Sequence, residues 1–212
     1  ETLSPQDFLA FRDRLGTSSG FESWQLRTLE MLLGLKSEQR IGGMDPMEHN
    51  KKLHSEGKLS DEVMANMERI ATLPSLYDVL LRWLERTPVN GVSGDKKVMT
   101  EFVESHISSM IEHGETVISH MVKIGHGNEE TIRPRITAGI DAAREFLLPS
   151  GEVSFSRAGL LFIESYRELP LLSWPRRLID TVVDLEESML LFRSHHARMV
   201  ERMIGRRMGT GG

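Results

Sequence analysis

The sequence predicts an all-α protein, a helical bundle with its longest helix near the C-terminal end. Apolar residues recur at helical spacing along most of the 212 residues. Strand signals, meaning alternation within clusters of Val, Ile, Thr and Tyr, are scarce, and the chain has only two Tyr. The longest uninterrupted helical pattern covers residues 176–205.

The first helices are predicted from their start and stop signals. Ser4 is a good cap residue, and Pro5 suits the first position of a helix. The glycine-rich stretch 16–20 ends this first helix, and a second helix is expected over 21–35.

The next part of the chain carries mixed signals. Residues 37–71 and 88–98 are expected to be loop or excursion segments, and 88–94 is the best linker candidate. Within the first segment, Gly, Pro and Asn favour a loop over 42–57, whereas 59–70 has a helical pattern. The following helix is expected over 76–84.

The remaining helices are expected over 99–124, 129–147, 155–166 and 176–205. Pro134 should interrupt the second of these, because proline lacks an N–H and clashes with the preceding turn. Residues 149–151 should close the same unit, and Pro170 and Pro175 bracket a bend before the last helix.

Composition excludes several classes of protein. A mass of 24.0 kDa suits one domain with a real hydrophobic core, or at most two small ones, and we expect a single domain over residues 1–212. The chain has no Cys, which rules out disulfides and thiolate metal sites, and its net charge of −5 argues against a surface built to bind polyanions. Neither a transmembrane run nor a signal segment is visible, so we expect a cytoplasmic protein with no membrane partner.

Arginines gather near the end of the last helix, at positions 193, 198, 202, 206 and 207. A helix C-terminus favours positive charge, and this explains them more simply than a nucleic-acid site. We therefore expect no nucleic-acid partner.

The last helix distinguishes two adjacent histidines. At ~100° per residue, His196 lies within roughly 20° of Leu185 and Met189, so its imidazole belongs to the apolar stripe. His195 shares its angle with Ser188 on a polar stripe. Two interpretations of His196 stay open on spacing alone. It is either a core histidine, which is the commoner case, or an axial haem ligand against an apolar wall.

Arg27 also has two interpretations. It shares a helical stripe with Gly20 and Gly34, which leave space around a guanidinium that can form a bidentate pair with a carboxylate. The commoner alternative is a surface arginine paired with Glu30 or Glu22.

A third feature is a stripe of His106, His113 and His120 on the helix expected over 99–124. Successive members lie ~10 Å apart along the helix, too far to share one metal ion. We interpret the stripe as a wet or interfacial face.

Two ordered, separated motifs resemble the tryptophan 2,3-dioxygenase family. The first is FRDRLGTSSGFESWQLR at 11–27, and the second runs from FRSHH at 192–196 through 199–205 to GTGG at 209–212. Residues 75–86 and 165–170 also resemble the family. Clear similarity covers about half of the chain.

This resemblance implies an all-helical homotetramer that binds haem b, with His196 on the long C-terminal helix as the proximal iron ligand. Val200 is then expected beside the haem. Arg27 would bind the substrate carboxylate near Trp24, and Thr210, with Gly209 beside it, would contact the amino-acid end of the substrate. The implied reaction inserts both atoms of O₂ across the indole C2–C3 bond of L-tryptophan, or of a related indole amino acid, and gives N-formyl-kynurenine.

The sequence also departs from the family. Glu22 stands where the family usually has Gln, and Trp24 and Leu26 differ from the common residues near the carboxylate site. The family's N-terminal helices, with the distal histidine, precede the first motif, so we expect a fragment that lacks them and assign no catalytic residue in this chain. Two alternatives stay open, a haem-dependent monooxygenase or hydroxylase of an aromatic amino acid in secondary metabolism, and a non-catalytic helical ligand-binding or interaction protein.

Overall fold

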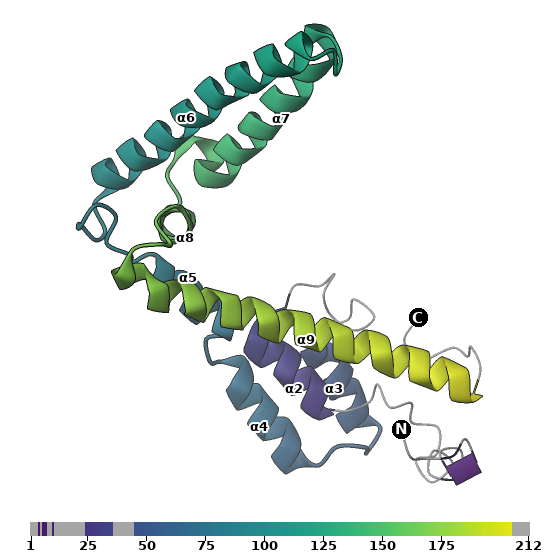
Figure 1. The fold of residues 1–212 in the computed structure, drawn as a ribbon. Helices are drawn as coiled ribbons and strands as arrows, with labels where there is room; N and C mark the ends of the chain where they lie inside the picture. The colour runs from purple at the N-terminus through teal and green to yellow at the C-terminus, as the bar shows by residue number, and fades with distance from the viewer. Residues whose placement is uncertain (1–3, 5, 8–9, 11–23, 36–44, 205–212) are drawn as a thin grey trace. The chain divides into compact units, whose positions relative to one another are not determined.

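The computed structural model describes residues 4, 6–7, 10, 24–35 and 45–204, and these confirm the all-α prediction (Figure 1). Within this part of the chain the residues form helices and connecting turns, with no strand beyond a single Val89–Val92 bridge. The helices are α2 (Trp24–Leu33), α3 (Pro46–Ser55), α4 (Asp61–Ala71), α5 (Leu76–Leu84), α6 (Lys96–Lys123), α7 (Glu129–Leu147), α8 (Phe155–Ser165) and α9 (Ser173–Ile204), with 3₁₀ turns η4 (Pro149–Gly151) and η5 (Pro170–Leu172).

The contacts within the chain define two units. The first comprises Glu1–Val79 with Leu178–Gly212, and the second comprises Leu80–Arg177. The boundaries between the two units fall within α5, after Val79, and within the first turns of α9, after Arg177. Among the described helices, none is long and apolar enough to cross a membrane.

The first unit begins with the predicted cap at Ser4. The Ser4 hydroxyl accepts a hydrogen bond from the backbone N–H of Asp7 at 3.1 Å, as an N-cap residue does. Helices α2, α3 and α4 pack against one another around a small apolar core (Figure 1). The buried apolar side chains of this core are Leu35, Leu53, Met64 and Met67.

Helix α3 corrects the prediction of a loop over 42–57. The Asp45 carboxylate accepts hydrogen bonds from the backbone N–H groups of Met47 (2.9 Å) and Glu48 (3.2 Å), which satisfies the open first turn. Pro46 occupies the first helical position, where its missing N–H costs nothing. The prediction treated Asp and Pro as loop residues, although here they start a helix.

Other elements lie close to their predicted bounds. Helix α4 confirms the helical pattern at 59–70, and α5 has the predicted bounds 76–84. Residues 88–94, predicted as a linker, lie within the second unit, and Asn90 and Gly91 have positive φ there. The excursion predicted over 88–98 ends early, because Asp95 caps α6 by accepting from the N–H groups of Lys97 and Val98.

In the second unit, α6 and α7 form an antiparallel hairpin (Figure 1). Gly114 sits where the helices approach, since a Cβ there would lie 2.9 Å from Ile136 Cγ2. Helix α7 continues through Pro134, so the predicted interruption is wrong. Because proline has no N–H, the backbone carbonyl of Glu130 lacks its usual helical donor. Glu130 is an exposed residue of the first turn, so water can solvate this carbonyl.

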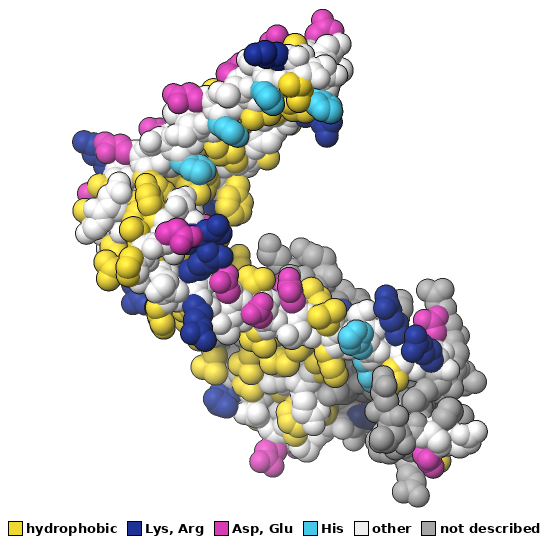
Figure 2. Space-filling view, viewed as in Figure 1, with side chains coloured by type: hydrophobic (Ala, Val, Ile, Leu, Met, Phe, Trp, Pro, Cys, Tyr) yellow, Lys and Arg dark blue, Asp and Glu magenta, His cyan; other side chains and the backbone are white. Residues whose placement is uncertain are grey.

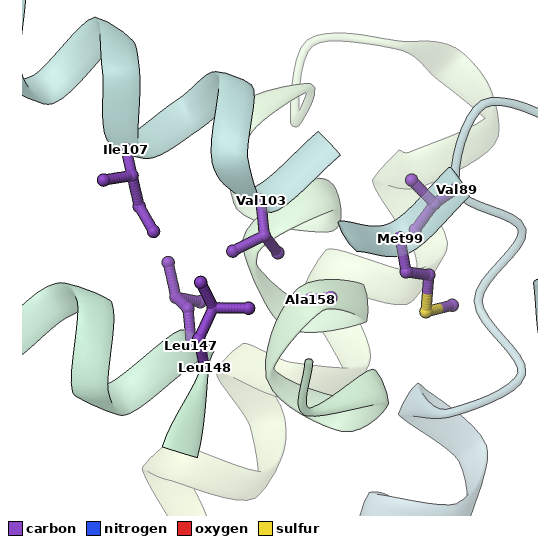
Figure 3. Packing of buried hydrophobic residues seen from close by; sticks show 7 residues of the cluster. All are labelled: Val89, Met99, Val103, Ile107, Leu147, Leu148 and Ala158. Atoms are coloured by element: carbon purple, nitrogen blue, oxygen red, sulfur yellow. The ribbon is translucent and has the colours of Figure 1, made fainter. Parts of the chain in front are cut away.

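The core of the second unit lies where α6, α7 and α8 meet (Figure 3). It consists of seven buried residues, Val89, Met99, Val103, Ile107, Leu147, Leu148 and Ala158. Gly159 lets α8 approach the end of α5, because a Cβ at this position would collide with the Leu84 carbonyl oxygen and the Thr87 side chain. Pro170 opens η5 as predicted, whereas Pro175 lies inside the first turn of α9 rather than before it.

Candidate functional site

The two histidines on α9 have different environments. His195 is exposed, whereas the His196 side chain is half-buried. The ring of Phe192, one helical turn earlier, stacks on the His196 imidazole with centroids 6.1 Å apart and planes inclined by 23°. This confirms the predicted difference in exposure between the adjacent histidines, and it identifies Phe192 as a side chain against the imidazole.

The stripe that carries His196 is only partly covered. Met189 is buried at 9% exposure, but Leu185 and Phe192 retain 42% and 55% of their surface. An imidazole therefore lies among exposed apolar side chains on one helix face, which is an unusual combination for a core histidine. Val200 lies one turn further along α9, and its side chain is outside the described residues.

Arg27 lies in the interior rather than on the surface. It is 3% exposed, and its Nη1 donates a hydrogen bond to Oε2 of Glu30 at 3.1 Å. Glu30 is fully buried. Of the two sequence interpretations, the pairing with Glu30 is right and the surface location is wrong.

A buried ion pair of this kind is energetically expensive to break. Breaking a buried ion pair by removing one partner typically costs roughly 3–5 kcal/mol, because a charge in a low-dielectric interior then loses its opposite charge. Glu30 is thus one buried partner of Arg27, three residues further along α2.

Trp24 and Gly34 complete the described part of this region. Trp24, half-buried, lies one turn before Arg27, and its carbonyl accepts a hydrogen bond from Thr28 Oγ1 at 2.8 Å. Gly34 ends α2 with φ +75°, and any Cβ there would meet the Ser75 side chain.

Several predicted site residues lie outside the described residues. These are Gly209, Thr210 and the part of the first motif at 11–23. His196 and Arg27 belong to the same unit of the chain, on α9 and α2.

Sequence reasoning missed Asn50. It is fully buried on α3, and within the described part of the chain its side-chain amide has no hydrogen-bond partner. The signal for its burial was its spacing from Pro46 and Leu53, which lie on the same buried face of α3. The Gly, Pro and Asn residues of 42–57 favour a loop and so hide this helical spacing.

A cavity in the second unit was also missed. Its volume is about 680 Å³, and its lining includes Trp83, Arg86, Phe162, Leu172 and Trp174. The two tryptophan rings meet edge to face with centroids 6.0 Å apart. The cavity is thus mostly apolar, with one guanidinium in its wall.

The histidine stripe of α6 lies on the hairpin of the second unit. Figure 2 shows a row of histidine side chains along the arm formed by the hairpin, and these histidines belong to α6 and to the turn that follows it. His113 and His120 are exposed and His106 is half-buried. Across the described residues, no three His, Asp or Glu side chains come together in a way that could hold a metal ion.

Comparison with known proteins supplies the family. A sequence model described as tryptophan 2,3-dioxygenase matches residues 1–212. A tryptophan 2,3-dioxygenase of Sorangium cellulosum is 40% identical over 225 residues, covering 100% of this chain and 54% of the relative. A tryptophan 2,3-dioxygenase-like protein of Xanthomonas campestris is 39% identical, covering 99% of this chain and 82% of the relative.

A third relative, named tryptophan 2,3-dioxygenase 2, comes from Ralstonia nicotianae. It is 38% identical and aligns with 100% of this chain and 61% of its own length. The chain thus spans about half to four-fifths of the curated relatives it matches. Since both the family model and these relatives align along essentially all of residues 1–212, the chain belongs to the tryptophan 2,3-dioxygenase family.

Proposed function

We propose that this chain carries the proximal haem ligand and the carboxylate-binding arginine of an enzyme that oxidises L-tryptophan or a related indole amino acid. The net reaction adds both atoms of O₂ across the indole C2–C3 bond and yields N-formyl-kynurenine. The observation that carries the proposal is the half-buried His196, stacked on Phe192 within an exposed apolar stripe, in a chain of this family.

The described residues of α9 fit a haem. A haem needs one imidazole nitrogen for iron and an apolar wall for the porphyrin, and the stripe of His196, Leu185 and Phe192 offers both. His196 would hold the iron and Val200 would lie in the wall. Bound haem would supply the dioxygen chemistry, and residues of this chain would hold the haem and orient the substrate.

Arg27 is proposed to bind the substrate carboxylate. A guanidinium presents five N–H donors in a fixed plane, so it orients a carboxylate as well as attracting it. When Arg27 fixes the amino-acid end of the substrate, the indole at the other end is aligned with the reacting centre. Trp24, Gly209 and Thr210 are proposed to complete this end of the site.

Product analysis tests the reaction. The full-length protein, loaded with haem and reduced without air, is mixed with L-tryptophan and O₂. N-formyl-kynurenine, heavier than the substrate by two oxygen atoms, is the expected product. A product heavier by one oxygen atom would assign a monooxygenase instead, and haem loading without any product would favour a binding protein.

A conservative variant tests Arg27. Arg27→Lys keeps a cation beside Glu30 but loses the planar fork, so the KM for L-tryptophan should rise about tenfold or more while haem absorbance is unchanged. Arg69→Leu, an exposed arginine of α4 in the same unit, is the matched control and should leave the KM near wild type. Equal loss of haem and substrate binding in Arg27→Lys would make Arg27 structural.

We also propose a homotetrameric assembly, with the distal side of the haem supplied by residues other than those described. Its support is the family to which the chain belongs. Sedimentation of the full-length protein gives the mass of the assembly directly, and a monomeric mass would reject the tetramer.

A further inference from the structure

We propose that Glu30 is a positioning residue, whose buried carboxylate holds the Arg27 guanidinium in the orientation that receives the substrate carboxylate. The inference rests on the proposed substrate role of Arg27. It assigns to Glu30 a share in substrate affinity although Glu30 itself does not meet the substrate.

Burial separates the two roles. The Arg27 side chain keeps 4% of its surface and the Glu30 side chain keeps none. The Glu30 carboxylate is thus fully enclosed, and the proposal gives the direct contact with substrate to Arg27 alone. Any influence of Glu30 on substrate has to pass through the guanidinium, to which it is bonded at 3.1 Å.

The pair restricts a side chain that is otherwise flexible. A mobile arginine loses rotamer entropy when it is fixed, and that loss falls on substrate binding if the side chain is mobile beforehand. Glu30 lies at i+3 on the same helix and accepts from Nη1, so it fixes the guanidinium plane before the substrate arrives. Substrate affinity then includes a contribution from preorganisation.

The geometry of the guanidinium allows one group to serve two carboxylates. Its five N–H donors point in several directions within one plane, so a carboxylate at Nη1 does not by itself exclude another elsewhere on the fork. Glu30 also balances the buried positive charge, which makes Arg27 tolerable in the interior in the absence of a ligand.

The test compares two ligands that differ only in the carboxylate. Dissociation constants of L-tryptophan and of tryptamine, which lacks the carboxylate, are measured by the haem absorbance change in the full-length holoenzyme. Glu30→Gln keeps the shape of the side chain and removes its charge, and it should weaken L-tryptophan binding about tenfold while tryptamine binding stays within about twofold. Glu30→Asp should give a smaller loss with the same selectivity.

Two controls separate positioning from stability. Thr28→Val removes a part-buried hydrogen bond of α2, from Thr28 Oγ1 to the Trp24 carbonyl, and should lower the melting temperature without changing the ratio of the two ligand affinities. In an Arg27→Lys background, Glu30→Gln should weaken L-tryptophan binding by much less than in wild type, because the two residues act as a unit.

Equal losses for both ligands, or no loss for either, would overturn the role of Glu30. If Glu30→Gln does not fold, the same comparison in Glu30→Asp decides between the outcomes. Failure of the proposed function is distinct from these results, since it would appear in the wild-type protein as the absence of product, or as an Arg27→Lys variant that binds L-tryptophan normally.

Discussion

At the scale of single residues, burial separates side chains that the sequence leaves equivalent. His195 and His196 are adjacent, yet one is exposed and the other is half-buried against Phe192. Helical periodicity predicts this difference, because neighbouring residues point about 100° apart. The burial of Arg27 is not predictable in the same way, because burial depends on contacts between helices, and α2 packs against α3 and α4.

Glycines provide a second case at this scale. Gly159 and Gly139 both lie inside helices, but only the first has close neighbours, the Leu84 carbonyl and Thr87. Nothing lies within 4 Å of a Cβ at Gly139. The sequence does not reveal the difference, since it arises from a contact between α8 and the end of α5.

The two glycines predict opposite effects of the same substitution. Gly159→Ala should lower the free energy of unfolding by about 2 kcal/mol, because the added methyl overpacks a tight contact. Gly139→Ala should raise it by ~0.5–1 kcal/mol through lower backbone entropy of the unfolded chain. Urea unfolding of both variants measures the difference, and a Gly159→Ala protein as stable as wild type would contradict the close packing.

At the scale of elements, caps explain where prediction succeeded and where it did not. The start at Ser4 and the bounds of α5 follow from local signals that were recognised. Helix α3 was missed although Asp45, Pro46 and Glu48 form a start signal, because Gly and Asn nearby favoured a loop.

Helix α3 should depend on its cap. Asp45→Ala removes the acceptor for two backbone N–H groups and should lower the free energy of unfolding by about 1 kcal/mol. Asp45→Asn, which retains a side-chain oxygen, is the control and should cost less. Identical stability of the Ala variant and wild type, measured by thermal melting, would mean that packing alone holds α3.

The hairpin of α6 and α7 is joined by an exposed charge network. Arg133 bonds to Glu115 on α6, with Nη2 to Oε2 at 2.9 Å, and to Glu129 on its own helix at 2.7 Å. The hydrogen bond from Arg133 lowers the pKa of Glu115 below its ordinary value of 4.5, and the charge of Arg133 adds to this effect.

This lowered pKa predicts a pH dependence of stability. Below pH 4.5 the unfolded chain binds more protons at Glu115 than the folded chain does, so the stabilisation is present above that pH and is lost as pH falls through the lower folded pKa. Glu115→Gln should therefore be less stable than wild type at neutral pH. The difference in free energy of unfolding between the variant and wild type should become smaller in acid. Urea midpoints at about pH 7 and about pH 3 measure this. The control is Glu104→Gln, which removes an exposed carboxylate from the same helix. A stability difference between Glu115→Gln and wild type that is the same at both pH values would contradict the role of the lowered Glu115 pKa.

At the scale of the whole molecule, the two units have different characters. The unit that contains α2 and α9 holds the buried Arg27–Glu30 pair and the partly covered His196 stripe. The other unit holds the apolar core of Figure 3, the hairpin and the cavity beside Trp83 and Trp174. Helical periodicity predicted the fold class and most elements, whereas the division into units and the cavity depend on contacts between distant segments.

The candidate site was predicted in part, for the same reason. Spacing along one helix brought out His196 and Arg27, but Glu30, Phe192 and Asn50 acquire meaning only from what lies beside them. Positions such as Gly209 and Thr210 stay predictions from the family motif.

The most direct measurement is the Soret absorbance of the full-length protein after reconstitution with haem, in wild type, His196→Ala and His195→Ala. His196→Ala should lose the axial ligand and with it the wild-type band, and added imidazole should restore it, while His195→Ala should retain the band because that side chain is exposed. Circular dichroism checks that both variants are helical. A wild-type Soret band in His196→Ala, or its loss in His195→Ala alone, would contradict the assignment of His196 as the haem ligand.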